Sequence, residues 1–231
     1  MVRDLMLLEL NEAYERQLPS NQGGIQFTFA HVVLALFLFD MYGKMGRVDM
    51  ARQLAMGRGS LRTFTGRLKA GLGLIESNST RAHVLSTKGR DVLAKIKAEF
   101  TMIGNIPVVF DELTFAKFNA IGRLSSQNIE PGKIDDIEPM TIVNVAHEQG
   151  GKGLISLFVQ PDRALKLLGV PIDLKKNYTS EWIKLNELFS LHDGDLLLIA
   201  SADTEFDAKL AVIAAAVGAL QMIGKHRSTD G

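Results

Sequence analysis

The 231-residue sequence contains no cysteine, and this absence excludes several kinds of site. Without thiolates the chain can form neither a disulfide nor a zinc finger. Its five histidines and its acidic residues show no spacing typical of metal ligands, so we expect neither a metal nor a cofactor. A chain without disulfides suits the reducing interior of a cell.

Long hydrophobic runs are also lacking. The longest apolar run, residues 32–39, is too short to cross a bilayer. The first residues do not resemble a signal peptide, because acidic side chains interrupt their apolar stretch at Asp4, Glu9, Glu12 and Glu15. We therefore expect a soluble, cytoplasmic protein with no membrane partner.

Net charge is absent from the chain as a whole, because 26 lysines and arginines balance 26 acidic residues. The charges are nevertheless segregated. Residues 44–97 contain twelve basic and three acidic residues, a net charge of +9, whereas residues 1–43 carry −3 and residues 98–231 carry −6. Such a separation is expected when one module meets phosphate groups and the other does not.

The basic segment contains two short helical patterns joined by a glycine-rich turn, within residues 46–71. In the first pattern, Val48, Ala51 and Leu54 repeat at helical spacing. In the second, apolar residues three or four positions apart are Leu61, Phe64, Leu68 and Leu72. The opposite face of this second helix is therefore basic, and we expect Ser60 to be its N-cap. Two helices joined so closely are typical of a helix-turn-helix.

Further elements are expected on both sides of this pair. Residues 29–42 form a strongly apolar helical segment. Residues 74–76 and 82–85 can pair as a hairpin, and a helix is expected over residues 87–103. The order helix, helix, helix, hairpin, helix is that of a winged helix, in which the hairpin is the wing.

Residues 29–96 resemble the winged helix-turn-helix of archaeal transcriptional regulators, in particular two-domain archaeal proteins whose C-terminal domain has no known function. The matching positions are Gly46, Arg47, Ala51, Leu54, Gly57, Gly59, Arg62, Leu68, Lys69, Thr87, Lys88 and Gly89. The similarity covers the middle third of the chain well and the C-terminal half more weakly. It implies a cytoplasmic regulator that binds double-stranded DNA in a sequence-specific manner.

Under this interpretation the second helix enters the major groove, and its Arg62, Thr63 and Lys69 face bases or phosphates. Arg81 at the tip of the hairpin would reach the backbone or the minor groove. The complete set of candidate DNA contacts is Arg47, Arg58, Ser60, Arg62, Thr63, Gly66, Arg67, Lys69, Arg81, Lys88 and Arg90. Gly66 either permits close approach of the DNA backbone or is simply tolerated on the surface.

The length of the chain favours two domains in an α+β protein. We expect an N-terminal amphipathic helix and linker over residues 1–24, a winged helix-turn-helix domain over 25–104, and a smaller-stranded α+β domain over 105–231. The first helix needs an apolar partner, which is either its own winged domain or a second subunit. Since many such regulators bind two half-sites, we expect a homodimer.

The C-terminal half shows short apolar runs separated by turn residues. We expect strands at residues 107–110, 140–146, 153–159 and 195–202, and a long helix at 204–224. This domain would bind a small-molecule effector or mediate dimerisation.

Ser201, Asp203 and Thr204 lie where the last expected strand meets this helix, and they are the weak candidates for an effector site. Their competing role is to cap the helix. The segments 150–153 and 192–195 are better explained as turns than as an anion cradle or a metal site.

No catalytic motif appears in the C-terminal half, so we do not expect an enzyme. The glycine and tyrosine motifs of archaeal CTP-dependent riboflavin kinases, which also carry a winged helix, are not found in residues 107–231. The alternative function is a winged helix that serves as a protein-interaction module, joined to a metabolite-binding or enzymatic C-terminal domain.

Overall fold

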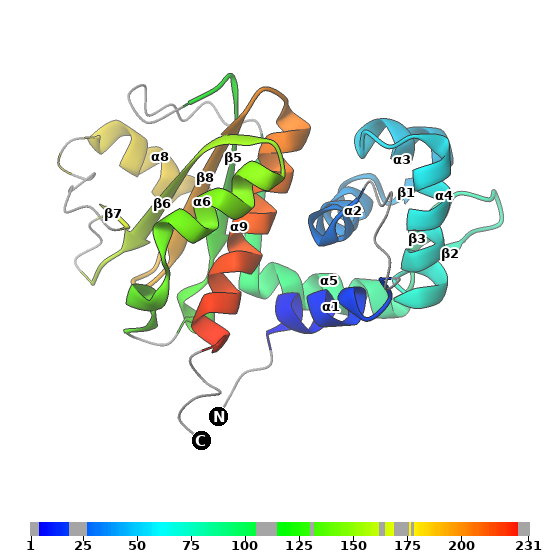
Figure 1. Cartoon of the computed structure of the whole chain (residues 1–231), viewed down its shortest axis with the longest axis horizontal. Helices are drawn as coiled ribbons and strands as arrows, with labels where there is room; N and C mark the ends of the chain where they lie inside the picture. Colours follow the sequence, from blue (N-terminus) through cyan, green and yellow to red (C-terminus); the bar gives the residue numbers. More distant parts are fainter. Residues whose placement is uncertain are drawn as a thin grey trace. The chain divides into compact units, whose positions relative to one another are not determined.

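The computed structural model describes residues 5–18, 27–104, 115–129, 132–161, 165–168, 176 and 178–225. The chain is a mixture of helices and strands with two separate sheets, as expected for an α+β protein (Figure 1). It divides into two compact units, Val2–Lys97 and a second that begins at Ala98. We call them the N-terminal and C-terminal units.

The N-terminal unit is built around α2 (Phe29–Tyr42), the apolar helix expected from the sequence. Ten of its fourteen residues are buried, so the helix is enclosed on most sides. Its first turn is closed by a capping box, in which the Thr28 backbone N–H donates to Nδ1 of His31 at 3.0 Å. A helix that is apolar around its circumference is stable only when it is buried in this way.

Helix α1 (Met6–Glu15) packs on its own unit. Leu7, Leu10 and Tyr14 are buried within the single chain. The Tyr14 hydroxyl donates a hydrogen bond to the Phe27 carbonyl at 3.1 Å, and the burial of Tyr14 raises the pKa of its phenol. The apolar face of α1 is therefore covered without a second subunit, which is the first of the two alternatives.

Helices α3 (Arg47–Gln53) and α4 (Arg58–Gly66) form the expected pair. The N-cap of α4 is Gly57, and the backbone N–H of Leu61 donates to the Gly57 carbonyl at 2.9 Å. The expectation that Ser60 caps this helix is wrong, because the extended residue that precedes the first turn is Gly57. The last turn widens into a π-helical segment, Arg67–Gly71, labelled η1.

The expected hairpin is present as β2 (Ile75–Ser77) and β3 (His83–Leu85), which joins β1 (Lys44–Met45) in an antiparallel sheet of order β1-β3-β2. His83 lies opposite Ser77 on one side and Met45 on the other. Helix α5 (Thr87–Glu99) follows the sheet.

The C-terminal unit contains a five-stranded antiparallel sheet of order β4-β5-β8-β6-β7. The strands are β4 (Phe100–Gly104), β5 (Phe118–Leu124), β6 (Gly151–Val159), β7 (Leu165–Leu167) and β8 (Leu196–Ala202). One face packs against α6 (Pro139–Glu148) and α9 (Glu205–Lys225), and the other against α8 (Thr179–Phe189) (Figure 1). The central strand β8 is buried at every residue because helices cover both faces.

Two short 3-10 helices, η2 (Ser126–Asn128) and η3 (Lys133–Asp136), lie between β5 and α6 along the chain. Helix α9 contains the segment Glu205–Gly224, which by length and hydropathy alone could cross a membrane. Within this fold 72% of its apolar window is buried, so packing on the sheet accounts for its composition.

Two of the expected elements differ in the structure. Residues 140–146 are not a strand but part of α6, because Pro139 occupies the first helical position and Ile142 and Ala146 are buried one turn apart. The expected helix over 87–103 ends at Glu99, and the next residues enter the sheet as β4. The expected strand at 107–110 lies outside the described residues.

Candidate functional site

A basic groove of about 880 Å³ runs along the exposed side of α4 in the N-terminal unit. Its lining residues are Arg47, Val48, Ala51, Arg58, Leu61, Arg62, Thr65, Gly66, Lys69, Ser77 and His83. The four cationic side chains among them are all exposed, and none of these lining residues is acidic. The groove therefore presents positive charge to whatever enters it.

The fold of α4 explains this arrangement. Leu61, Phe64 and Leu68 are buried at helical spacing, so the helix is anchored along one side. Arg58 and Arg62, one turn apart, lie on the exposed side and reach the groove. Anchoring by three buried residues fixes the direction in which the two arginines point.

The hairpin closes the other side of the groove. Nζ of Lys69 donates a hydrogen bond to Oγ of Ser77 at 3.1 Å, which links the end of the helix to β2. His83, opposite Ser77 in the sheet, is only 7% exposed. Among the described residues neither ring nitrogen of His83 has a hydrogen-bond partner. Burial lowers the pKa of this imidazole, and Arg47 and Lys69 lower it further.

Arg67 does not belong to the groove, although the sequence predicted it as a DNA contact. Its guanidinium lies 5.0 Å from the centre of the Phe27 ring, and its Nη1 atom is buried. The Arg67 guanidinium also opposes the rise in the pKa of Tyr14. Arg67 therefore packs on the hydrophobic core, because it lies one turn after the buried Phe64 and five residues after Arg62, on a different side of the helix.

Five further predicted contacts, Ser60, Thr63, Arg81, Lys88 and Arg90, also lie outside the groove lining. Ser60 is partly exposed within the first turns of α4, and Thr63 is exposed on the same helix. Arg81 is exposed at the hairpin turn, where its φ of +61° is a left-handed conformation. Lys88 and Arg90 are exposed on α5.

Arg90 is partly engaged in local contacts. Its Nη1 donates to the Leu85 carbonyl at 2.8 Å and its Nη2 to Oγ1 of Thr87 at 3.2 Å. These bonds tie the start of α5 to the end of β3. Arg90 can still present charge on the surface, but part of its hydrogen-bonding capacity is used by the fold.

Six lining residues were not among the predicted contacts: Val48, Ala51, Leu61, Thr65, Ser77 and His83. Val48 repeats at helical spacing with Ala51 and Leu54 and was therefore expected to face the core, yet it is 79% exposed. Ser77 and His83 meet only through the register of the hairpin. The expected strands alone did not define that register, because the length of the intervening turn sets it.

The weak candidates at the end of β8 make contacts within the fold. Ser201 is buried, and its Oγ donates to Oδ1 of Asn119 at 2.7 Å. Oγ1 of Thr204 accepts a hydrogen bond from the backbone N–H of Asp207 at 3.0 Å, which is an N-cap contact for α9. Asp203 is exposed and pairs with Lys152 at 3.3 Å.

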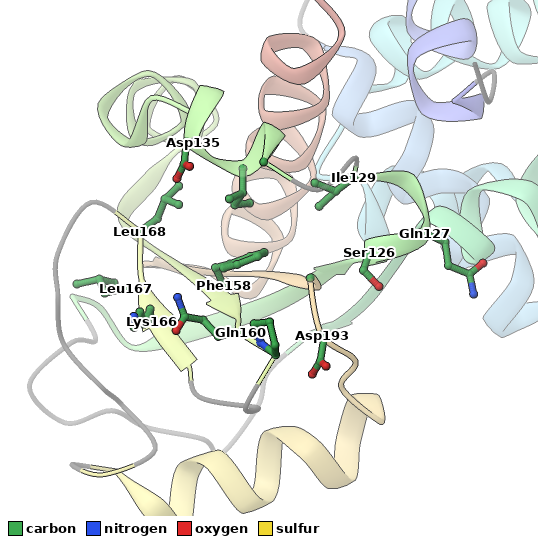
Figure 2. A pocket seen from close by; sticks show the side chains of 14 residues that line it. Ser126, Gln127, Ile129, Asp135, Phe158, Gln160, Lys166, Leu167, Leu168 and Asp193 are labelled. Atoms are coloured by element: carbon green, nitrogen blue, oxygen red, sulfur yellow. The ribbon is translucent and has the colours of Figure 1, made fainter. Parts of the chain in front are cut away.

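A pocket of about 730 Å³ lies elsewhere in the C-terminal unit. Figure 2 shows Phe158 of β6 near the centre of the view, with Lys166 and Leu167 of β7 to one side and Ser126 and Ile129 to the other. None of Ser201, Asp203 and Thr204 lines it. Its wall combines apolar surface with a few polar groups, as in many small-molecule sites.

The carboxylate of Asp195 organises one rim of this pocket. It is buried and accepts hydrogen bonds from the backbone N–H groups of Ser126 at 2.8 Å and His192 at 2.9 Å. The Arg123 guanidinium lies 3.7 Å from the same carboxylate. The expected turn at residues 192–195 is confirmed, with Gly194 at a φ of +87°. The described part of the chain holds no group of three or more potential metal ligands.

No family model and no curated protein matches the chain. Its fold is similar to that of a solved structure, a hypothetical protein from Pyrococcus horikoshii OT3, with a TM-score of 0.62 and 22% sequence identity. The match covers 89% of this chain and 97% of the other. At this identity the likeness extends to the fold alone.

Proposed function

We propose that the N-terminal unit is a winged helix-turn-helix and that the chain is a transcriptional regulator that binds double-stranded DNA. The observation that carries this proposal is the basic groove between α4 and the β2–β3 hairpin. The order of α2, α3, α4, hairpin and α5 supports it, because this is the order in winged helices.

Helix α4 enters the major groove in this proposal. Arg62 and Thr63 on its exposed side contact base edges or phosphates. Arg47, Arg58 and Lys69 neutralise phosphates along the groove, and phosphate contacts supply affinity rather than sequence preference. Outside the groove, Arg81 at the hairpin turn reaches the backbone or the minor groove, and Lys88 and Arg90 lie beside flanking phosphates.

The proposal includes a homodimer, because two copies of α4 can then read two half-sites about 34 Å apart. The mass of the protein in solution tests this directly. A dimer has twice the 25.3 kDa mass of the chain. Since the apolar face of α1 is packed within its own unit, the contact between subunits uses a surface other than this face.

The test of DNA binding is the affinity for a mixed-sequence duplex measured against salt concentration by fluorescence anisotropy. The four cations in the groove should by themselves give a slope of log K against log salt of roughly −3 to −4 per subunit, because each neutralised phosphate contributes about −0.9; contacts by Arg81, Lys88 and Arg90 should make it steeper. Arg62→Ala should weaken binding and make this slope shallower by about 1.

Lys95→Ala is the matched control, because Lys95 is exposed on α5 and does not line the groove. It should leave both the affinity and the slope unchanged. A wild-type protein that does not bind the duplex at low salt would contradict the proposal. It would favour the alternative, in which the winged helix binds another protein.

A second proposal concerns the C-terminal unit, which we suggest binds a small-molecule effector in the pocket around Phe158. The specific observation is a pocket whose apolar wall carries Lys166 and Asp135 at its edge. An amphipathic metabolite with a polar end group fits such a wall best. Binding there would regulate the affinity of the N-terminal unit for DNA.

A further inference from the structure

His83 is the least expected member of the basic groove. A buried polar side chain normally has a hydrogen-bond partner, because burying it without one costs free energy. His83 lines the groove, is 93% buried, and has no partner for either ring nitrogen among the described residues. An imidazole left in this state is a group that a ligand could satisfy.

The surroundings of His83 are positive. Arg47 from α3 and Lys69 from η1 are the charged groups that act on its ring. Its neighbours across the sheet are Ser77 and Met45, which carry no charge. In the free protein, burial first and these two cations second lower the pKa of His83 from its ordinary value, which favours the neutral ring.

We propose that the groove receives one phosphodiester group of the duplex between Arg47, Lys69 and His83, and that His83 takes up a proton as DNA binds. This inference rests on the proposed function. The ring nitrogens are covered in the free protein. Contact with phosphate therefore requires that exposed side chains such as Lys69 change rotamer, and the phosphate replaces Ser77 as the partner of Lys69.

The proton balance follows from the charges. A neutral imidazole becomes an imidazolium, the proton comes from the solvent, and the phosphodiester keeps its negative charge. The anion offsets the repulsion from Arg47 and Lys69 and accepts a hydrogen bond from the ring. Both effects favour the protonated form in the complex. Binding therefore strengthens as the pH falls.

The experiment is a titration of a mixed-sequence duplex with the full-length protein at constant low salt, between about pH 5 and pH 8. We expect the wild-type affinity to rise toward lower pH by up to about tenfold per pH unit for each His83 that takes up a proton. His83→Gln keeps an N–H donor but does not titrate, so its affinity should not follow this dependence. His147→Gln, at an exposed histidine of the C-terminal unit, should behave as the wild type.

Folding is checked in the same buffers by far-UV circular dichroism. His83 has a lowered pKa in the folded protein, so its contribution to stability is complete above pH 6.5 and is lost as the pH falls below that value. An NMR titration of the His83 ring in the wild type, free and DNA-bound, is a second measurement that needs no variant. We expect a higher pKa in the complex.

The inference is overturned if the wild type binds DNA with no pH dependence, if His83→Gln keeps the dependence, or if DNA leaves the pKa of His83 unchanged. Each of these outcomes leaves DNA binding itself intact. A wild-type protein that fails to bind duplex at any pH removes both the inference and the proposed function.

Discussion

The arginines of α4 and its last turn illustrate how neighbours of the same type take different roles. Arg62 is exposed and lines the groove, whereas Arg67 stacks on Phe27 and has a buried Nη1 atom. They are five residues apart, so they lie on different sides of the helix. One should therefore contribute to DNA binding and the other to stability.

Arg67→Ala tests this division. It should lower the free energy of unfolding by about 1 to 2 kcal/mol, because it removes a partly buried cation–π contact and the packing of its aliphatic stem. Its DNA affinity should change by less than about 0.5 kcal/mol. Arg62→Ala should show the reverse pattern. Urea denaturation and duplex titration of both variants make the comparison, and a matching loss of affinity in both would place Arg67 on the DNA.

A substitution at Gly66 tests whether this glycine is simply tolerated on the surface or is needed for close approach of the DNA backbone. It is exposed in α4, and a Cβ atom added there would meet nothing within 4 Å. Gly66→Ala should therefore raise the free energy of unfolding by about 0.5 to 1 kcal/mol. We expect DNA affinity to stay unchanged. A loss of about tenfold, or 1.4 kcal/mol, would instead show that the DNA backbone approaches this residue closely.

Gly73 is the matched control for Gly66. It ends the helical segment with a φ of +68°, a conformation that residues with a side chain rarely adopt. Gly73→Ala should lower the free energy of unfolding by about 1 to 2 kcal/mol. The two glycine variants should therefore have opposite effects on stability, because only Gly73 has a positive φ.

At the scale of the element, helix α1 buries its apolar face within its own unit. Leu7 is completely buried, so Leu7→Ala should cost about 2 to 5 kcal/mol. Far-UV circular dichroism should report an earlier urea transition of the N-terminal unit. Trp182, the single tryptophan, lies in α8 of the C-terminal unit, and its fluorescence transition should not move.

The same experiment distinguishes packing within a chain from packing between chains. If α1 covers its own unit, the urea midpoint of the N-terminal transition does not depend on protein concentration. A midpoint that rises with concentration would mean that α1 is exchanged between subunits, contrary to the structure.

The whole molecule combines a basic segment and an acidic remainder whose charges cancel. The proposed division of labour places DNA on the first and an effector on the C-terminal unit. A ligand that binds the Phe158 pocket should therefore change duplex affinity by about 5- to 150-fold, the usual range of coupling between two sites.

A thermal-shift screen with cellular metabolites, followed by duplex titration with each ligand found, measures this coupling. Phe158→Ala should abolish both the thermal shift and the change in affinity, and Lys184→Ala on α8 is a control outside the pocket. A ligand whose effect survives Phe158→Ala binds elsewhere. A ligand that binds the pocket without altering DNA affinity would contradict the effector role.

Elements with strong local patterns were predictable. The apolar helix α2, the hairpin, strand β8 and helix α9 appear near their expected positions. Strand β5 was missed, because its residues alternate poorly and Gly122 lies under Phe100, a contact that exists only once the sheet forms. Helix α6 was mistaken for a strand since its β-branched residues outweighed the signal of Pro139.

Local pattern was enough to define the basic segment, the two helices joined by a turn and the exposed position of Arg62, because charge and helical spacing are properties of neighbouring residues. Only tertiary packing decided that Arg67 contacts Phe27 in the core and that Ser201 forms a buried hydrogen bond with Asn119. It also brought His83 beside Arg47 and Lys69. Those contacts join distant segments, and their geometry depends on strand register and on which helix face is covered.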